Sequence, residues 1–304
     1  MVRRALVVAV ITAVCAGAAR GASAPIPPSS ALVLAPSDFK SGAVVQSETN
    51  TSVSGKQLFL RVFKAGARFG SKSLATVVSV ALVEPDASTA QFDFGDFELS
   101  AKTKSGRHEI AQIWALGFVK GLKLASGGRN PLKSEKFTVG LPTDVGPAGM
   151  LLPISDKTTL GTLHMSLAIA DVDRVFSIVL LMGEPNAALA PGDARSALTA
   201  AEKRLATAFT VANTAAPTIS GSAVVGQTLT ADAGTWTGAP SSFGYSWSRC
   251  DATGASCRPV AGATTAAYQV GAADTGSTLI VGVTGANSVG SASATSAATS
   301  VVGS

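Results

Sequence analysis

The side chains that could do acid–base chemistry in this 304-residue chain are few. The sequence holds two histidines, His108 and His164, and histidine is the side chain whose charge changes most readily near neutral pH. His164 lies on the polar face of an expected strand, and His108 lies at the start of an expected helix. Both positions are typical of solvated or hydrogen-bonded side chains, so we expect neither histidine to be catalytic.

Five carboxylates form two groups that could hold a cation or share a proton. Asp171 and Asp173 flank an expected turn, and Asp93, Asp96 and Glu98 cluster in an expected helix. Turn formation and a solvated helix face explain both groups without chemistry. The sequence also has no Gly-x-Ser-x-Gly elbow, phosphate-binding loop, dinucleotide fingerprint or HExxH segment. We therefore expect a protein that is not an enzyme, with no catalytic, cofactor-binding or metal-binding residues.

The cysteines indicate an oxidising compartment. Cys15 lies in an expected leader segment, which leaves Cys250 and Cys257 as an even pair in the mature chain. We expect these two residues to form a local disulfide. A redox or metal-binding pair is the alternative, but the spacing is too long and neither histidine lies nearby in the sequence.

Residues 1–24 have the pattern of a secretory signal peptide. Basic residues at the start are followed by an apolar run and then by small residues. Cleavage after Ala18 or after Ala24 fits the small-residue rule, although Pro25 disfavours the second. An uncleaved membrane anchor is the alternative, but the apolar run is shorter than the ~20 residues that a span needs. The sequence therefore predicts a secreted, extracellular protein, cell-surface associated or free, with no transmembrane anchor in the mature chain.

Composition and charge narrow the partners. The chain is 46% hydrophobic and only 14% charged, with 31 glycines, which suits a β-rich extracellular protein. The formal charge of +5 falls by three if Arg3, Arg4 and Arg20 leave with the leader. Such a small, dispersed surplus argues against nucleic acid as a partner. An extracellular protein, a polysaccharide or a small apolar ligand are the partners left open.

The chain is long enough for two domains with separate cores. We expect a Pro/Ser-rich, extended lead-in over 25–36, an α+β domain over 37–212, a polar linker over 213–216 and a second domain over 217–304. In the first domain, β-branched and aromatic runs predict strands. These strands are expected over 42–45, 58–64, 75–84, 136–141, 150–154, 160–169 and 174–182.

Helices are expected after Pro85 and near Glu109 between the two groups of strands, and after Asp193 at the end of the first domain. The last of these carries an apolar stripe of Leu198, Ala201, Leu205 and Phe209. The two strands around Ala170 to Asp173 are close enough to form a hairpin. The order of elements predicts an antiparallel sheet with its helices on one side.

Aromatic residues in the expected helices could line an apolar cleft between sheet and helices. The candidates are Phe92, Phe94, Phe97 and Trp114. Packing in the core is the more usual role of such residues, but a cleft of this kind would make the first domain a sensor for a small molecule or a lipid.

The first domain resembles the sensor-type or lipoprotein domains of actinobacterial cell envelopes, which are related to the PsbP-like fold. The resemblance rests on the opening segment Leu32 to Phe39, on the Arg61-Val62-Phe63 strand, and on the ending in Val175 to Leu181, Asp193 and a helix. It covers about 180 residues, a normal domain size, and implies a fold and an extracellular location rather than a particular activity.

Residues 217–304 resemble the immunoglobulin-like repeats of bacterial secreted and surface proteins. The resemblance rests on a series of motifs in order: Pro217 to Gly221, Gly226 to Leu229, Gly234 to Trp236, Tyr245 to Cys250, Tyr268, Asp274 to Gly276 and Asn287 to Gly290. It implies an immunoglobulin-like β-sandwich.

Alternating apolar residues agree with that resemblance, because a period of two with frequent turn signals is typical of a β-sandwich. We expect Trp247 to be the central core aromatic, and Cys250 and Cys257 to close a loop rather than join two sheets. The expected core contains Leu229, Tyr245, Trp247, Leu279 and Val281.

Together these features predict a secreted or cell-envelope-associated, non-catalytic binding or adhesion protein. The first alternative is an extracellular sensor domain for a small molecule or lipid, carried on an immunoglobulin-like module. The second is a secreted hydrolase whose catalytic residues match none of the patterns above.

Overall fold

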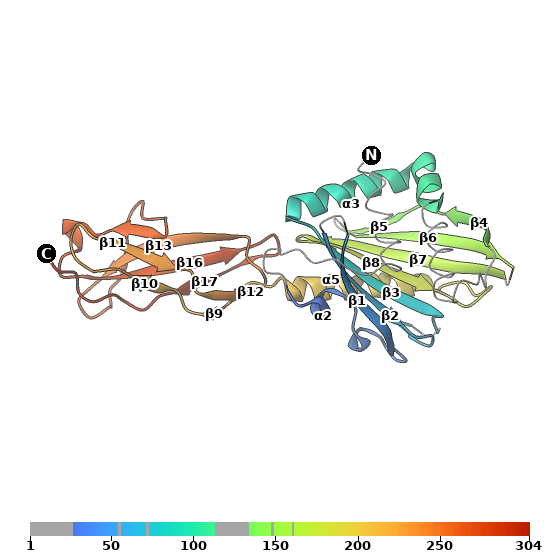
Figure 1. Ribbon diagram of the computed structural model, residues 1–304, viewed down its shortest axis with the longest axis horizontal. Helices are drawn as coiled ribbons and strands as arrows, with labels where there is room; N and C mark the ends of the chain where they lie inside the picture. The colour runs from blue at the N-terminus through green and yellow to red at the C-terminus, as the bar shows by residue number, and fades with distance from the viewer. Residues whose placement is uncertain (1–26, 54–55, 71–72, 113–133, 147–148, 160) are drawn as a thin grey trace. The chain divides into compact units, whose positions relative to one another are not determined.

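The computed structural model describes residues 27–53, 56–70, 73–112, 134–146, 149–159 and 161–304 (Figure 1). The described chain forms two compact units, Pro28–Ala208 and Phe209–Ser304. The expected leader over 1–24 and its two cleavage points lie outside the described residues. Within those residues, no helix has the length and apolar character that crossing a membrane requires.

The first unit is built on one antiparallel sheet. The strand order is β1-β2-β3-β8-β7-β6-β4, with β5 paired to β6. The central strands are rich in valine, isoleucine and leucine, which suit a buried pleated surface. The strands are β1 (Val45–Val53), β2 (Lys56–Phe63), β3 (Thr76–Val83), β4 (Ser134–Val139), β5 (Thr143–Gly146), β6 (Gly149–Thr158), β7 (Gly161–Val172) and β8 (Val175–Met182).

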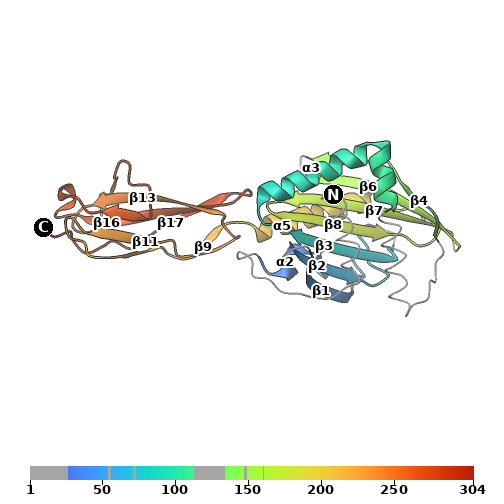
Figure 2. The same ribbon diagram turned by 45° about the horizontal axis from the view of Figure 1, so that its top comes forward.

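Helices cover both faces of this sheet, so the expectation of helices on one side was wrong. Helix α3 (Ala87–Lys102) lies on one face, and α5 (Pro191–Ala208) with the short α2 (Ser29–Leu32) lies on the other (Figures 1 and 2). The reason is visible in β7, where Leu167 and Ile169 enter the core under α3 while Ala168 and Ala170 enter the core under α5. A strand that is apolar on both faces needs cover on both.

Helix α3 begins and packs as its sequence predicts. The side chain of Asp86 accepts a hydrogen bond from the backbone N–H of Thr89 at 2.8 Å, which caps the helix. The rings of Phe94 and Phe97 each lie 6.2 Å from the ring of Phe176 on β8. These two phenylalanines therefore fill the core instead of lining a cleft. Phe92 is 73% exposed, and Trp114 lies outside the described residues.

A second helical stretch over 104–112 follows α3. It agrees with the helix expected near Glu109, and its Ile110 is buried in the same core as Phe94 and Phe97.

The expected extended lead-in over 25–36 is wrong from Ser29 to Leu34. Residues Ser29–Leu32 form α2, and Leu32, Val33 and Leu34 are buried. The backbone N–H of Leu34 donates to the hydroxyl of Ser79 on β3 at 3.0 Å. Three consecutive apolar residues outweigh the surrounding prolines and serines, and they attach this segment to the sheet. The single-turn helix η1 (Pro36–Asp38) follows.

Most of the other strands agree with the expected ones within a few residues, and β7 pairs with β8 in the expected hairpin, with Asp173 at a φ of 56°. Strand β1 differs, because it covers Val45–Val53 where only 42–45 was expected. Its polar sequence, VQSETNTSV, lacks the apolar alternation of a buried strand and suits an edge position.

The second unit consists of short strands around one hydrophobic cluster. Its sheets are β10-β11-β15, β14-β13-β16-β17 and the pair β12-β9. A single-turn helix η2 (Ala272–Asp274) precedes β16. The strands are β9 (Ala212–Ala215), β10 (Thr218–Ser220), β11 (Thr228–Asp232), β12 (Thr235–Thr237), β13 (Ser242–Cys250), β14 (Arg258–Pro259), β15 (Ala267–Gln269), β16 (Thr278–Ala286) and β17 (Ser291–Thr295).

Trp247 lies at the centre of this cluster, as expected. It is fully buried, its indole N–H donates to the carbonyl of Thr265 at 2.9 Å, and its ring stacks on Tyr268 with the centroids 5.2 Å apart. Leu229 from β11 and Leu279 and Val281 from β16 are buried in the same cluster. Tyr245 is partly buried and packs against it.

The segment expected to be a linker, 213–216, is instead mostly strand. Residues Ala212–Ala215 form β9, which pairs with β12. The amide of Asn213 donates to the carbonyl of Thr235 at 3.1 Å, and the hydroxyls of Thr214 and Thr235 lie 2.8 Å apart. Polar side chains that bond across a strand pair give the same composition as a linker, and this explains the error.

Cys250 and Cys257 form the expected disulfide across a separation of seven residues. It closes the loop between the end of β13 and the start of β14, which pair at Arg249 and Arg258. The bond therefore tightens one loop and does not connect the separate sheets.

Replacing both cysteines with serine is expected to leave the second unit folded. Closing an eight-residue loop removes about 2.5 kcal/mol of unfolded-chain entropy, which is the expected size of the loss from the missing cross-link. Urea denaturation followed by circular dichroism measures it. Complete unfolding of the second unit in the absence of urea would contradict this prediction.

Candidate functional site

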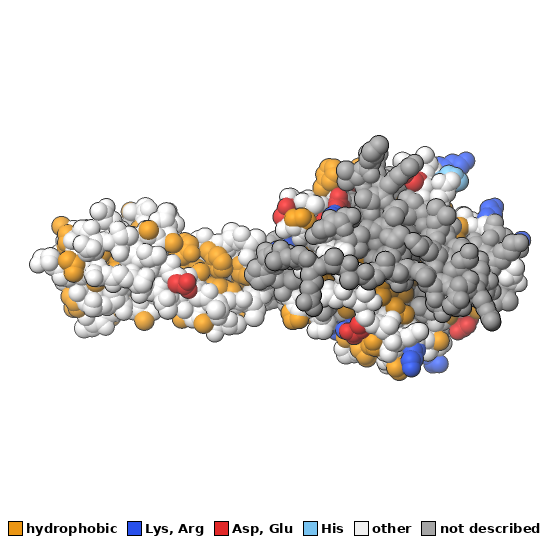
Figure 3. Space-filling view, viewed as in Figure 1, with side chains coloured by type: hydrophobic (Ala, Val, Ile, Leu, Met, Phe, Trp, Pro, Cys, Tyr) orange, Lys and Arg blue, Asp and Glu red, His pale blue; other side chains and the backbone are white. Residues whose placement is uncertain are grey.

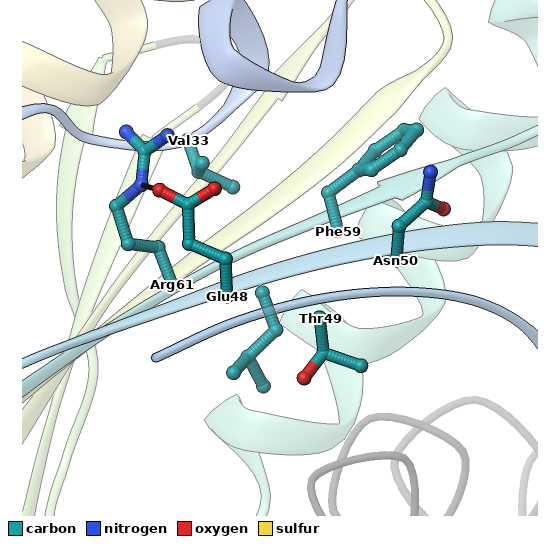
Figure 4. Close-up of a pocket in the computed structure, with 7 residues that line it drawn as sticks. Val33, Glu48, Thr49, Asn50, Phe59 and Arg61 are labelled. Atoms are coloured by element: carbon teal, nitrogen blue, oxygen red, sulfur yellow. Dashed lines mark hydrogen bonds and ion pairs between the residues drawn. The ribbon is translucent and has the colours of Figure 1, made fainter. Parts of the chain in front are cut away.

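A pocket of about 170 Å³ opens on the outer part of the sheet, between β1, β2 and the segment after α2. Figure 4 shows Glu48, Asn50, Phe59 and Arg61 on one side of the two strands, and Val33 lies on that side as well. The register explains this arrangement, because Glu48 lies opposite Arg61 and Asn50 lies opposite Phe59. Residues that face each other across an antiparallel pair project to the same side of the sheet.

Arg61 is the charged group at the base of this pocket. Only 6% of the residue is exposed. Its Nε donates to the Oε1 atom of Glu48 at 2.7 Å, and its Nη1 donates to the carbonyl of Leu34 at 2.6 Å. The Nη2 group has no partner among the described residues. Since an arginine is always charged, the protein keeps a buried cation here, and the described residues use only part of its hydrogen-bonding capacity.

Sequence reasoning missed Arg61 as a site residue, although a signal was present. The strand reads KQLFLRVF, in which Arg61 is the one charge between flanking apolar residues. Its position opposite an exposed edge strand and its cover by Val33 depend on the tertiary structure. The single charge in an apolar strand was the one sequence signal that marked Arg61 as a candidate site residue.

A second charged cluster lies at the end of the sheet beneath the start of α3. Lys56 Nζ lies 2.6 Å from Glu84 Oε2 and 2.8 Å from Asp93 Oδ2. The Glu84 side chain is fully buried. Burial lowers the pKa of Lys56, but its bonds to Asp93 and Glu84 outweigh that effect and hold the pKa above its ordinary value. Burial also raises the pKa of Glu84, and Lys56 offsets that only in part.

Asp171 lies at the same end of the sheet, at the end of β7. Burial, followed by repulsion from Asp173 and Glu84, raises its pKa to about 7. Within this cluster, the ion pair with Lys56 compensates the buried Glu84 carboxylate, whereas the ionised form of Asp171 is disfavoured in the fold.

The stability of the first unit is expected to fall as the pH rises from about 4 to about 7. The pKa of Asp171 is 3.8 when unperturbed and about 7 in the fold, so the folded state keeps a proton that the unfolded state has lost. Asp171→Asn is expected to raise the free energy of unfolding at pH 8 by about 2 kcal/mol, since partial exposure roughly halves the full effect.

Urea denaturation of the wild type and the Asp171→Asn variant at pH 4 and pH 8 measures this effect. Asp144→Asn, at an exposed carboxylate, is the control and should change little at either pH. A gain for Asp171→Asn that is equal at both pH values would contradict the assignment.

The structure separates the residues that were considered for catalysis. His164 and Asp171 lie seven residues apart on β7, which is about 23 Å along a strand. His108 is exposed on the helix over 104–112, with its Nε2 atom 3.1 Å from the amide of Gln112.

Two of the three helix carboxylates considered for cation binding pair with lysines instead. Asp93 pairs with Lys56, and Glu98 pairs with Lys102 at 2.6 Å. The described ranges contain no group of three or more His, Cys, Asp or Glu side chains arranged to hold a metal ion.

Comparisons with known proteins identify no family for this chain. No family model matches the chain, and no curated protein matches it. Among solved structures, it is similar to the extracellular domain of PknH from Mycobacterium tuberculosis, with 11% sequence identity, 64% of this chain covered and 90% of that chain covered. The TM-score is 0.25, so this likeness carries no argument. Both resemblances noted from the sequence stay predictions.

Proposed function

We propose that the protein is an extracellular binding protein whose first unit receives a small polar ligand in the pocket around Arg61. The observation that carries this proposal is the buried guanidinium at the base of the pocket, with its Nη2 group unpartnered among the described residues. We propose binding without chemical conversion, because His164 and Asp171 lie too far apart on β7 to act together.

Stability alone does not account for Arg61. Taking a charge out of water is costly, and well-packed apolar residues of similar size are often as stable as a buried ion pair or more so. Its neighbours on this strand face, Phe59 and Phe63, are apolar and buried, so a leucine or methionine would continue their pattern. An arginine at this position is better explained by a ligand that uses its donors.

The size and lining of the pocket limit the ligand. Its volume of about 170 Å³ is close to the ~150 Å³ of engineered cavities that hold benzene. Such a pocket accommodates one small group rather than a lipid chain. Phe94 and Phe97 are committed to the core under α3, which removes the support for an apolar ligand between sheet and helices.

The proposal also includes an extracellular location for the protein and a carrier role for its second unit. The leader pattern over 1–24 and the disulfide between Cys250 and Cys257 support an extracellular location.

Figure 3 shows few charged side chains on the visible face of the second unit. We propose that this unit is an immunoglobulin-like sandwich that carries the binding unit, which agrees with its sheets around Trp247.

Ligand-detected NMR of the full chain against a mixed library of small organic acids, amides, amines and monosaccharides tests the proposed function. We expect signals from at least one compound, and their loss in Arg61→Met. Arg68→Met, at an exposed arginine of the same unit, is the control and should bind as the wild type does.

Two results would contradict the proposal. One is a library in which no compound binds. The other is binding that persists unchanged in a folded Arg61→Met variant, because the ligand would then lie elsewhere.

A further inference from the structure

We propose that the group recognised in this pocket is a carboxylate, which binds the Nε and Nη2 edge of Arg61 in place of Glu48. This inference rests on the proposed function and gives it a ligand class. It follows from the geometry of the guanidinium, from the exposure of Glu48 and from the charge balance of the pocket.

The described residues use only half of the guanidinium edge that faces Glu48. A guanidinium offers its Nε and Nη2 hydrogens as a parallel pair, and this pair matches the two oxygens of a carboxylate. In Arg61, Nε donates to one oxygen of Glu48, Nη1 is committed to the carbonyl of Leu34, and Nη2 has no partner among the described residues. A carboxylate that could approach squarely would make two bonds where Glu48 makes one.

Glu48 is placed to yield to such a ligand. Its side chain is 57% exposed, whereas that of Arg61 is 7% exposed. Glu48 itself can move into solvent when a ligand carboxylate replaces it, because its side chain is exposed and the guanidinium then keeps a counter-charge. Glu48 therefore takes the place of the ligand carboxylate and pairs with the buried Arg61 guanidinium while the pocket is empty.

The charge balance selects an anion. Among the described residues that line the pocket, Glu48 and Arg61 are the charged ones. If a neutral ligand displaced Glu48, the buried guanidinium would lose its counter-charge, which is strongly unfavourable. A singly charged carboxylate preserves neutrality. An ammonium group would instead meet the positive charge of Arg61.

The rest of the ligand must be short and partly polar. Asn50 lies beside Glu48 on the same face of β1, and its exposed amide can both donate and accept hydrogen bonds (Figure 4). Phe59 is buried at the base and offers an apolar boundary. An N-acylated amino acid, with one carboxylate and one amide, has groups for both ends of the pocket.

Isothermal titration of the full chain with N-acetylglycine tests this inference, with N-acetylglycinamide as the neutral match. We expect N-acetylglycine to bind and the amide to bind at least tenfold more weakly. Glu48→Ala should tighten binding of N-acetylglycine by about two- to fivefold, because it removes the competitor. A gain in affinity cannot come from misfolding. Glu109→Ala, at an exposed glutamate, is the control and should leave the affinity unchanged.

Inorganic phosphate is the comparison anion, and it should bind more weakly than N-acetylglycine. Equal affinity for acid and amide, an unchanged affinity in Glu48→Ala, or tighter binding of phosphate would each overturn the carboxylate assignment. If neutral compounds of the library bind in a manner that depends on Arg61, only the ligand class fails and the proposed function stands. If nothing in the library binds, both fail.

Discussion

Replacing Trp247 with alanine is expected to lower the free energy of unfolding of the second unit by about 3–5 kcal/mol. The side chain is fully buried between Leu229 on β11 and Leu279 and Val281 on β16. Its removal leaves a large cavity, and it also leaves the carbonyl of Thr265 without its donor. A small β unit has little stability to spare, so this single change is expected to unfold a large share of the molecules near physiological temperature.

Urea denaturation followed by far-ultraviolet circular dichroism measures the effect of Trp247→Ala. Trp236→Ala is the matched control, because Trp236 belongs to the same unit but is only partly buried. Its loss should cost clearly less. Equal losses for the two variants would show that Trp247 is not the central core residue.

Replacing Lys56 with methionine is expected to destabilise the first unit by about 3–5 kcal/mol at pH 8. Lys56 is the cation that pairs with the fully buried Glu84 side chain, and its removal leaves a buried negative charge without compensation. Burial already raises the pKa of Glu84, and Lys56 opposes that effect. Without Lys56 the pKa of Glu84 rises further.

This prediction has a characteristic pH dependence. In Lys56→Met, the folded state binds a proton on Glu84 at a pH where the unfolded state does not. The destabilisation should therefore be largest above the folded pKa and should shrink as the pH falls towards the ordinary value of about 4.5.

The Lys56→Met, Glu84→Gln double variant should recover much of the lost stability at pH 8, because it removes the unpaired charge. Lys102→Met is the control, since its pairs with Glu98 and Asp144 are exposed and should contribute less than about 1 kcal/mol. Denaturation at pH 5 and pH 8 checks all three variants. A loss in Lys56→Met that is the same at both pH values would contradict the account.

The parts of the fold that could be predicted from the sequence are those in which local pattern and burial agree. The β7–β8 hairpin has long apolar runs joined by Asp173 and Arg174, and helix α5 has one apolar stripe. In the second unit, alternation around Trp247 was enough to identify the core. Such elements can be predicted with little information about the elements that pack against them.

The wrong predictions concern segments whose structure and burial depend on tertiary contacts. Polar composition concealed β1, which tolerates polar residues because it forms the edge of the sheet. Prolines and serines concealed the burial of Leu32 to Leu34. The second helical layer was missed because small residues such as Ala168 and Ala170 were not counted as a second apolar face.

The candidate site could be predicted least of all. Arg61 was visible as a charge in an apolar strand, but Glu48 comes from the strand that was not expected. Val33 comes from a segment that was expected to be an extended lead-in. The pocket forms where two poorly predicted segments, β1 and the segment after α2, meet the well-predicted strand β2.

Amide NMR of the full chain during titration with N-acetylglycine tests the central claim most directly. The account predicts that the largest chemical-shift changes fall on Glu48 to Asn50 and on Phe59 to Arg61, with little change over residues 217–304. Shift changes confined to the second unit, or none at saturating concentration, would contradict it.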